Sequence, residues 1–309
     1  MASLEFKLKL TEGVRADRAI SDDLSIKYPA LSKNEIKRWF KENRVSEKKE
    51  IGLKLLQSQH EMRPGLHDIV IEGVSENELT YARAAPSNAG SFLPVIYEDE
   101  SILILNKISG IPSLPQSASE TETAVGSALA YAPALSGIGI HPLEPGLLHR
   151  LDTATSGILA FAKTQTEYDR LRALWKFGAV KKIYRARVSA PHPRLPLIIE
   201  TKLAHDIHSK KKMIAVTKSG LKFRGKALDA HTVIAKAHAA LDLEIEITTG
   251  VMHQIRCHLA SQELPILGDE LYKGEKSSRL WLHSWKLELP ALNGAKIEIV
   301  SQLPEGWIT

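Results

Sequence analysis

The segment from His149 to Gly157 gathers side chains that can carry out chemistry. It holds the run His149-Arg150-Leu151-Asp152, then small hydroxyl residues and a glycine, directly before an apolar strand candidate. Charged side chains at the mouth of a buried strand need a partner or a function, because burying an unpaired charge is costly. A glycine lets the backbone turn tightly and lets a ligand approach closely. A salt-bridged turn and a reactive carboxylate at Asp152 both fit this pattern.

A second charged segment, Thr248 to Arg256, follows an alternating strand candidate. His253 and Arg256 are three residues apart and would share one face of a helix predicted from Met252 to Gln262. Arg256 stands near the end of a strand and is a candidate partner for a buried carboxylate. His253 taken alone fits a hydrogen-bonded structural ring as well as a site residue.

Charge points toward a polyanionic partner. The chain has 309 residues, a formal net charge of +5 and a sequence pI of about 9.1. An excess of positive charge favours binding to polyanions such as nucleic acids. Lysine and arginine crowd the stretch from Lys27 to Lys54, where Lys37 and Lys41 lie four apart and could face one phosphate backbone. A second cluster runs from Lys210 to Lys212.

Several classes of protein are disfavoured. The single cysteine, Cys257, can form neither an internal disulfide nor a cysteine-rich zinc module, and we predict no metal site. Apolar runs are too short to span a bilayer, and the first residues lack a secretory apolar core. We therefore expect a cytoplasmic protein that does not bind membranes.

The N-terminal region predicts two helices and some strand. The first helix is expected from Asp17 to Ile26. The second opens with a capping box at Ser32 to Glu35. Its apolar residues recur at helical spacing and form one stripe: Ile36, Trp39 and Phe40. A short strand is expected from Asp68 to Glu72. We predict a compact basic unit within residues 10–74.

The chain as a whole divides into three predicted parts. Residues 1–82 form a small basic domain. Residues 83–92 are rich in alanine, serine and glycine, with a proline, and have the composition of a linker. Residues 93–309 form a larger domain.

Strand patterns dominate that larger domain. Buried or alternating strands are predicted at six places: Ser101 to Asn106, Ile158 to Ala162, Ile183 to Val188, Leu241 to Thr248, Leu280 to Leu289, and Lys296 to Val300. One helix opens with a capping box at Thr164 and stops at Gly178. Helices are too few and too irregular for a doubly wound sheet. The pattern predicts an α+β domain around a large, mostly antiparallel sheet.

Six motifs in chain order resemble those of RluA-type pseudouridine synthases. The most specific is His149-Arg150-Leu151-Asp152, two further residues, then Thr155-Ser156-Gly157 and an apolar strand. The other five are Tyr97-Glu98-Asp99 before the strand to Lys107, Lys182-Ile183-Tyr184, His253-Gln254-Ile255-Arg256, Pro265-Ile266-Leu267-Gly268-Asp269 with Tyr272, and Leu280-Trp281-Leu282-His283. The resemblance covers about residues 93 to 303.

The resemblance implies that a uridine in RNA is isomerised to pseudouridine without a cofactor. Asp152 would be the catalytic carboxylate, Arg256 would pair with it and aim it, and Tyr184 would stack on the flipped uracil. Arg150 would fill the space that the base leaves. The remaining candidates for contacts with RNA are His149, His253, Lys37, Lys41 and Lys212.

Residues 10–74 resemble a small RNA-binding domain named after a ribosomal small-subunit protein. Because that domain usually accompanies synthases acting on ribosomal RNA, this substrate is favoured, with transfer RNA as an alternative and a monomer expected. The usual Val-Asn-Gly after the helix is replaced by Val45-Ser46-Glu47-Lys48. In the larger domain, Val251 stands where the family has an arginine.

Two other functions share features with this sequence. An aspartic protease would need a second carboxylate loop sharing a proton with Asp152, and the chain has no second copy. A non-catalytic RNA-binding protein or ribosome assembly factor would share the basic surface. The presence of Asp152, Tyr184 and Arg256 together favours an enzyme.

Overall fold

The structure, a computed structural model, describes residues 3–28, 31, 33–74, 84–87, 93–116, 120–192, 194–291 and 294–307. The chain divides into two compact units. The first comprises Met1–Ala85 with two short stretches, Gln116–Glu120 and Ile140–Pro145. The second comprises Pro86–Pro115, Thr121–Gly139 and Gly146–Thr309. Most of the predicted linker, residues 83–92, lies outside the described residues.

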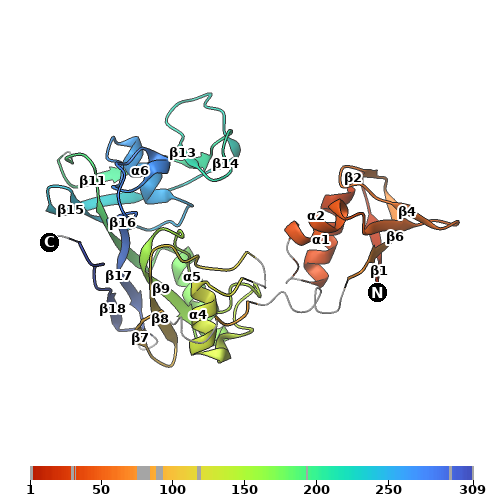
Figure 1. Cartoon of the computed structure of the whole chain (residues 1–309), viewed down its shortest axis with the longest axis horizontal. Coiled ribbons are helices and arrows are strands. Elements are labelled where there is room, and N and C mark those ends of the chain that lie inside the picture. Colours follow the sequence, from red (N-terminus) through yellow and green to blue (C-terminus); the bar gives the residue numbers. More distant parts are fainter. Residues whose placement is uncertain are drawn as a thin grey trace. The chain divides into compact units, whose positions relative to one another are not determined.

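The N-terminal unit packs two helices on a small sheet (Figure 1). The sheet order is β1 (Ser3–Leu10), β6 (Gly65–Glu72), β3 (Val45–Lys48) and β4 (Leu53–Leu55), and a separate pair is β2 (Val14–Arg15) with β5 (Glu61–Met62). Strand β1 was not predicted, although its residues alternate. Leu4, Phe6, Leu8 and Leu10 pack against the core, whereas the lysines between them are exposed.

Both predicted helices of this unit are present, as α1 (Ala16–Lys27) and α2 (Lys33–Lys41). The stripe predicted on α2, Ile36, Trp39 and Phe40, is buried, and so are Ile20 and Leu24 on α1. Ser32, the first residue of the predicted capping box, lies outside the described residues.

The second unit is built on a nine-stranded sheet. The strands that follow one another in hydrogen-bonded order are β11 (Leu197–Ile199), β15 (Thr232–Ala239), β16 (Asp242–Ile247), β10 (Lys181–Arg187), β17 (Leu282–Pro290), β9 (Ser156–Ala162), β8 (Ile102–Lys107) and β7 (Val95–Glu98). The ninth strand, β18 (Lys296–Val300), pairs with β17. Only the contact of β9 with β17 is parallel among the described pairs. The predicted α+β class and mostly antiparallel sheet are confirmed.

Gly157 explains how β9 and β17 come together. Its backbone has a φ of +109°, and a Cβ at this position would stand 2.2 Å from the carbonyl oxygen of Ser284 on β17. Only a residue without a side chain permits this approach. Gly157 therefore allows the chain that follows Asp152 to pack directly against the backbone of β17.

Helices cover the sheet at two places (Figure 1). Helix α4 (Ala124–Tyr131) contacts β8 and α5 (Gln165–Lys176) contacts β9, whereas α6 (Gln254–Ser261) contacts β13 (Met213–Ala215) and β15. Two short 3₁₀ turns are η1 (Pro133–Leu135) and η2 (Glu270–Tyr272).

The predicted capping box of α5 is half realised. The Thr164 hydroxyl accepts a hydrogen bond from the Glu167 backbone N–H, which is the usual N-cap contact. The Glu167 carboxylate turns instead to Arg170, 2.8 Å away. Gly178, with a φ of +71°, follows the last turn and ends the helix as predicted.

The start of α6 differs from the prediction. The helix begins at Gln254, and His253 precedes it in the left-handed conformation, with a φ of 54°. The prediction that His253 and Arg256 share a helical face is therefore wrong. The Gln254 side chain occupies the turn instead, where its Oε1 accepts hydrogen bonds from the Thr249 hydroxyl and the Val251 N–H.

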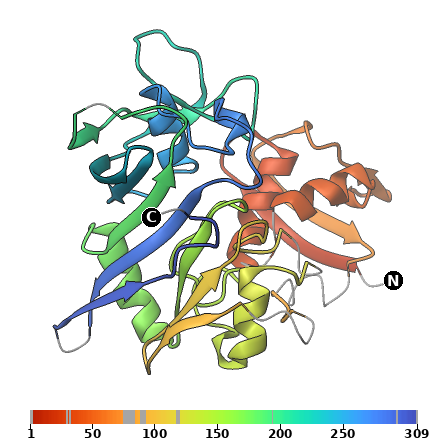
Figure 2. The same ribbon diagram turned by 60° about the vertical axis from the view of Figure 1, so that its left-hand side comes forward.

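A three-stranded sheet stands apart from the large one. It has the order β13, β12 (Leu203–His205) and β14 (Arg224–Leu228), and residues 203–228 are called the arm below. The loops of the arm project from the end of the second unit near α6 (Figure 2).

Candidate active site

The Asp152 loop is tied to the loop that follows β8. The Ser113 hydroxyl donates to the Leu151 carbonyl at 2.6 Å and accepts from the Leu151 N–H at 2.9 Å. The Ser109 hydroxyl donates to the Ala154 carbonyl at 2.7 Å. These bonds on both sides of Asp152 hold its backbone, so the carboxylate is presented from a rigid loop.

Arg256 lies between two carboxylates. One of its terminal nitrogens donates to Oδ2 of Asp152 at 3.0 Å. Its Nε and second terminal nitrogen donate to both oxygens of Asp269, at 2.7 and 2.8 Å. The Asp269 side chain is buried, whereas that of Asp152 is 25% exposed. Burial opposes the charge on Arg256, yet the two carboxylates raise its pKa above the ordinary value.

This geometry aims Asp152. The bidentate contact with Asp269 orients the flat guanidinium, and the remaining N–H then points at Asp152. The pairing predicted between Arg256 and Asp152 is present. Asp152 thus combines a held position with access to solvent, as a carboxylate acting on a substrate requires.

His253 faces the same carboxylate. Its Nε2 lies 3.8 Å from Oδ2 of Asp152, and its Nδ1 lies 3.1 Å from the hydroxyl of Tyr272. That hydroxyl accepts the Met213 N–H at 2.9 Å and can donate its own proton to Nδ1, an arrangement in which the ring proton of a neutral His253 sits on Nε2. Burial lowers the pKa of His253, although Asp152 raises it in part. The neutral form leaves Arg256 as the charged partner of Asp152.

Lys107 is buried beneath this loop. Its Nζ donates to three carbonyls, those of Ile108, Ile111 and Thr153, at 3.0, 2.7 and 3.0 Å. Burial lowers the pKa of Lys107 to about 7, with Asp152 raising it and Arg279 lowering it further. The ammonium form has three N–H donors for these three acceptors. Through its bond to the Thr153 carbonyl, Lys107 therefore helps to hold the Asp152 loop in place.

Tyr184 and Arg150 take different positions near the carboxylate. Tyr184 lies buried on β10, where Ser284 on β17 hydrogen-bonds its side chain. Burial raises the pKa of its hydroxyl, and the charge of Asp152 adds to this effect. Arg150 is exposed on the loop two residues before Asp152.

His149 turns inward. Its ring stacks on Trp175, with centroids 5.4 Å apart, and its Nε2 accepts the Ala160 N–H at 3.3 Å. Burial lowers its pKa to about 3, so the ring is neutral. These contacts are those of a structural ring, and the predicted contact of His149 with RNA stays a prediction.

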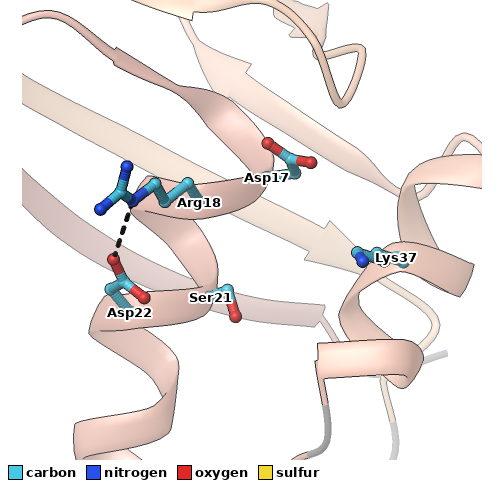
Figure 3. A pocket seen from close by; sticks show the side chains of 5 residues that line it. All are labelled: Asp17, Arg18, Ser21, Asp22 and Lys37. Carbon is cyan, nitrogen blue, oxygen red and sulfur yellow. Dashed lines mark ion pairs between the residues drawn. The ribbon is translucent and has the colours of Figure 1, made fainter. Parts of the chain in front are cut away.

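The other predicted RNA contacts fall in two places. Lys212 belongs to the arm, and its Nζ lies 5.6 Å from the centre of the Tyr272 ring. Lys37 and Lys41 are exposed on α2 in the N-terminal unit. Figure 3 shows that Lys37 lines a hollow with two carboxylates of α1, Asp17 and Asp22.

The N-terminal unit is not basic overall. Residues 1–82 contain 14 Lys and Arg and also 14 Asp and Glu, so their formal charges cancel. Many of these groups form salt bridges: Arg15 with Asp17, Arg38 with Glu42, Lys48 with Glu5, and Lys49 with Glu47. The prediction of a basic domain rested on the cations alone, and in that respect it is wrong.

Three residues at the site were given no role by the sequence analysis: Asp269, Tyr272 and Lys107. Asp269 and Tyr272 belong to the motif that begins at Pro265 and resembles the family's. They are more than a hundred residues from Asp152 in the sequence, so their link to it through Arg256 and His253 was not predicted. Lys107 closes a strand and could be read as an ordinary surface lysine. Val251, in place of the family's arginine, packs with Met213, Cys257 and Tyr272 at the base of the arm.

Comparison with known proteins identifies the family. The family described as RNA pseudouridylate synthase matches residues 101–261, about half of the chain. The chain belongs to this family. Ribosomal large subunit pseudouridine synthase D of Neisseria meningitidis serogroup A is 31% identical over 79% of this chain and 60% of its own length. The enzyme of that name from Zymomonas mobilis is 33% identical over 67% of this chain and 65% of its own. The resemblance to RluA-type synthases is confirmed.

Solved structures agree on the fold. Human RNA pseudouridylate synthase domain containing 4 has a TM-score of 0.52 and 25% identity over 68% of this chain and 88% of that chain. Human RNA pseudouridylate synthase domain containing 1 has a TM-score of 0.55 at 20% identity, covering 70% of this chain and 86% of that chain. The match to the two curated synthases spans 60% and 65% of their lengths.

The described residues contain neither a candidate metal site nor a candidate membrane span. No group of three or more His, Cys, Asp and Glu side chains there could hold a metal ion. No helix in the described part is long and apolar enough to cross a membrane.

Proposed function

We propose that this pseudouridine synthase family member isomerises specific uridines in RNA to pseudouridine, with ribosomal RNA as the favoured substrate. The observation that carries the proposal is the chain of contacts from Asp269 through Arg256 to Asp152. It presents one oriented carboxylate from a loop that hydrogen bonds hold on both sides. The names of the curated relatives support ribosomal RNA.

The reaction needs no oxidation or reduction. The bond from C1′ of the ribose to N1 of uracil breaks, the base turns, and a bond forms from C1′ to C5. The C5 proton leaves to solvent or a base, and N1 takes up a proton, so the product is an isomer of the substrate. The nucleotide must first leave the RNA stack, at a cost of a few kcal/mol. Asp152 acts on the flipped nucleotide. Arg256 holds that carboxylate in position through a charge-assisted hydrogen bond.

Two side chains accommodate the flipped base in this proposal. The ring of Tyr184 stacks on the uracil, a contact worth about 1–3 kcal/mol per base. Arg150, exposed beside Asp152, enters the space that the base leaves, because a flat guanidinium stacks on bases and bonds phosphates. The buried side chains around Asp152 keep water from the detached base.

The proposal includes a division of labour along the chain. Residues 93–309 carry the chemistry, residues 1–82 form a separate RNA-binding domain, and residues 83–92 link the two. A monomer that works in the cytoplasm completes the proposal. Sedimentation of the purified chain tests the monomer, and localisation of a tagged chain tests the compartment.

The test is pseudouridine mapping of total RNA from cells with and without the gene, with Asp152→Ala as the rescue control. We expect one or a few uridines of ribosomal RNA to lose modification, and only the unaltered chain to restore them. Loss at transfer RNA positions would move the substrate there. Unchanged maps in both strains would favour a non-catalytic assembly factor, as would full rescue by Asp152→Ala.

A further inference from the structure

The arm carries the whole net positive charge of the chain. Residues 203–228 contain seven Lys and Arg and one Asp, an excess of six, whereas the entire chain has an excess of five. The other residues together are thus close to neutral, with one net negative charge. The seven cations of the arm are Lys210, Lys211, Lys212, Lys218, Lys222, Arg224 and Lys226.

The arm offers one carboxylate against its seven cations. Its one carboxylate, Asp206, accepts a hydrogen bond from the backbone N–H of His208 at 2.7 Å. Within the described residues, none of the seven cations forms a salt bridge. Six of them are exposed, and Lys212 is half-buried over the Tyr272 ring. An exposed excess of this size lowers the free energy of a polyanion held against the arm.

The arm also sits next to the reaction centre within the same unit. Its strand β13 packs on α6, the helix that carries Arg256, and the Met213 N–H bonds the Tyr272 hydroxyl. Tyr272 in turn bonds His253, whose Nε2 is 3.8 Å from Asp152. Only the side chains of Tyr272 and His253 therefore lie between Met213 of the arm and the Asp152 carboxylate in this series of contacts. An RNA whose uridine reaches Asp152 brings its neighbouring phosphates within reach of the arm.

We infer that the arm is the main electrostatic binding surface for the phosphate backbone of the substrate RNA, and that it outweighs the N-terminal unit in this respect. The inference rests on the proposed function for the identity of the polyanion. Phosphate contacts release condensed counterions, so each contact steepens the fall of affinity with salt. The arm thus supplies most of the salt dependence of binding.

The experiment compares two triple variants that remove the same number of charges. One carries Lys210→Gln, Lys211→Gln and Lys222→Gln in the arm. The matched control carries Lys37→Gln, Lys41→Gln and Lys54→Gln in the N-terminal unit. All six side chains are exposed. Both are made in the full chain with Asp152→Ala, so that the RNA is not converted during titration. The probe is a fluorescently labelled stem-loop of large-subunit ribosomal RNA, titrated at several KCl concentrations.

We expect the slope of log affinity against log salt to fall by about 2–3 in the arm variant, since each phosphate contributes about 0.7–0.9. The control should lose less than half as much. Equal losses, or a larger loss in the control, would overturn the inference, and so would an unchanged slope in the arm variant. Thermal unfolding checks that each variant is folded. Failure of the proposed function is distinguishable, because it would appear as absent pseudouridine formation by the unaltered chain while the slopes are still measured.

Discussion

The N-terminal unit and the arm both contain clusters of lysine, yet they differ in what surrounds those lysines. In the N-terminal unit each cluster is matched by acidic residues, and pairs such as Lys48 with Glu5 form across its surface. In the arm, seven cations accompany one aspartate that bonds a backbone N–H. The difference teaches that a run of lysines indicates a polyanion site only when the opposite charges are counted as well.

A second contrast concerns the ion pairs themselves. Pairs of the N-terminal unit such as Lys48 with Glu5 lie at its surface, where water screens them. The pair of Arg256 with Asp269 is buried, so removing the Asp269 carboxylate leaves a buried charge without its bidentate partner. Removing a partner of the buried pair therefore has the largest expected effect.

Asp269→Asn should lower the free energy of unfolding by about 3 kcal/mol, because the buried Arg256 would lose its bidentate partner. Turnover should fall as well, since the guanidinium would no longer be held toward Asp152. Denaturant unfolding and single-turnover pseudouridine formation measure the two effects. Glu5→Gln is the matched control, because it removes one partner of a pair about half exposed on each side, and it should cost less than about 1 kcal/mol. Similar losses in both variants would erase the contrast between buried and surface pairs.

Tyr272→Phe tests whether the contact between Met213 of the arm and His253 affects the chemical step or RNA binding. The variant keeps the ring beneath Lys212 but removes the hydroxyl that joins Met213 to His253. One lost hydrogen bond is worth about 0.5–1.5 kcal/mol, so kcat should fall roughly 2- to 12-fold while the Kd for RNA stays within about twofold. Rapid-quench kinetics and equilibrium titration give the two values. A weaker Kd with an unchanged kcat would mean that Tyr272 serves the arm and does not position His253.

The smallest expected effect is a dependence on pH at Lys107. With a pKa of about 7, its ammonium loses a proton as pH rises from 6 to 9. It then has two N–H donors for the three carbonyls of Ile108, Ile111 and Thr153, the last of which lies in the Asp152 loop. The rate of the chemical step should fall by up to about tenfold over this range. Stability changes in the opposite sense. Between pH 7 and the ordinary value of 10.5, the unfolded chain binds a proton that the folded chain does not, so stability rises with pH.

Lys107→Met is the control for that profile. It should be slower than the unaltered chain and show no decline between pH 7 and 9, because the titrating group is gone. A decline of the same size in Lys107→Met would assign the pH dependence to another group.

Local patterns predicted six strands of the large sheet and the helices α5 and α6, but they missed α4, β7, β11, β15 and the three strands of the arm. Alternation predicted β16, an apolar run predicted β9, and Thr164 with Gly178 predicted both ends of α5. These signals depend on neighbours a few residues apart. The start of α6 was missed because Met252 and His253 are compatible with a helix by propensity, and the Gln254 side chain instead bonds Thr249 and Val251 ahead of the first turn.

The sequence by itself determined the family, the α+β fold and the segment that holds Asp152, because motif order and strand periodicity are written in residues close together in the chain. The net charge of residues 203–228 also follows from the sequence alone. Only the tertiary structure decided which charges meet. Asp269, Arg256 and Asp152 come from three separate segments, and Lys107 reaches Thr153 across 46 positions. Such contacts depend on how strands pair and helices pack, and no local pattern records them.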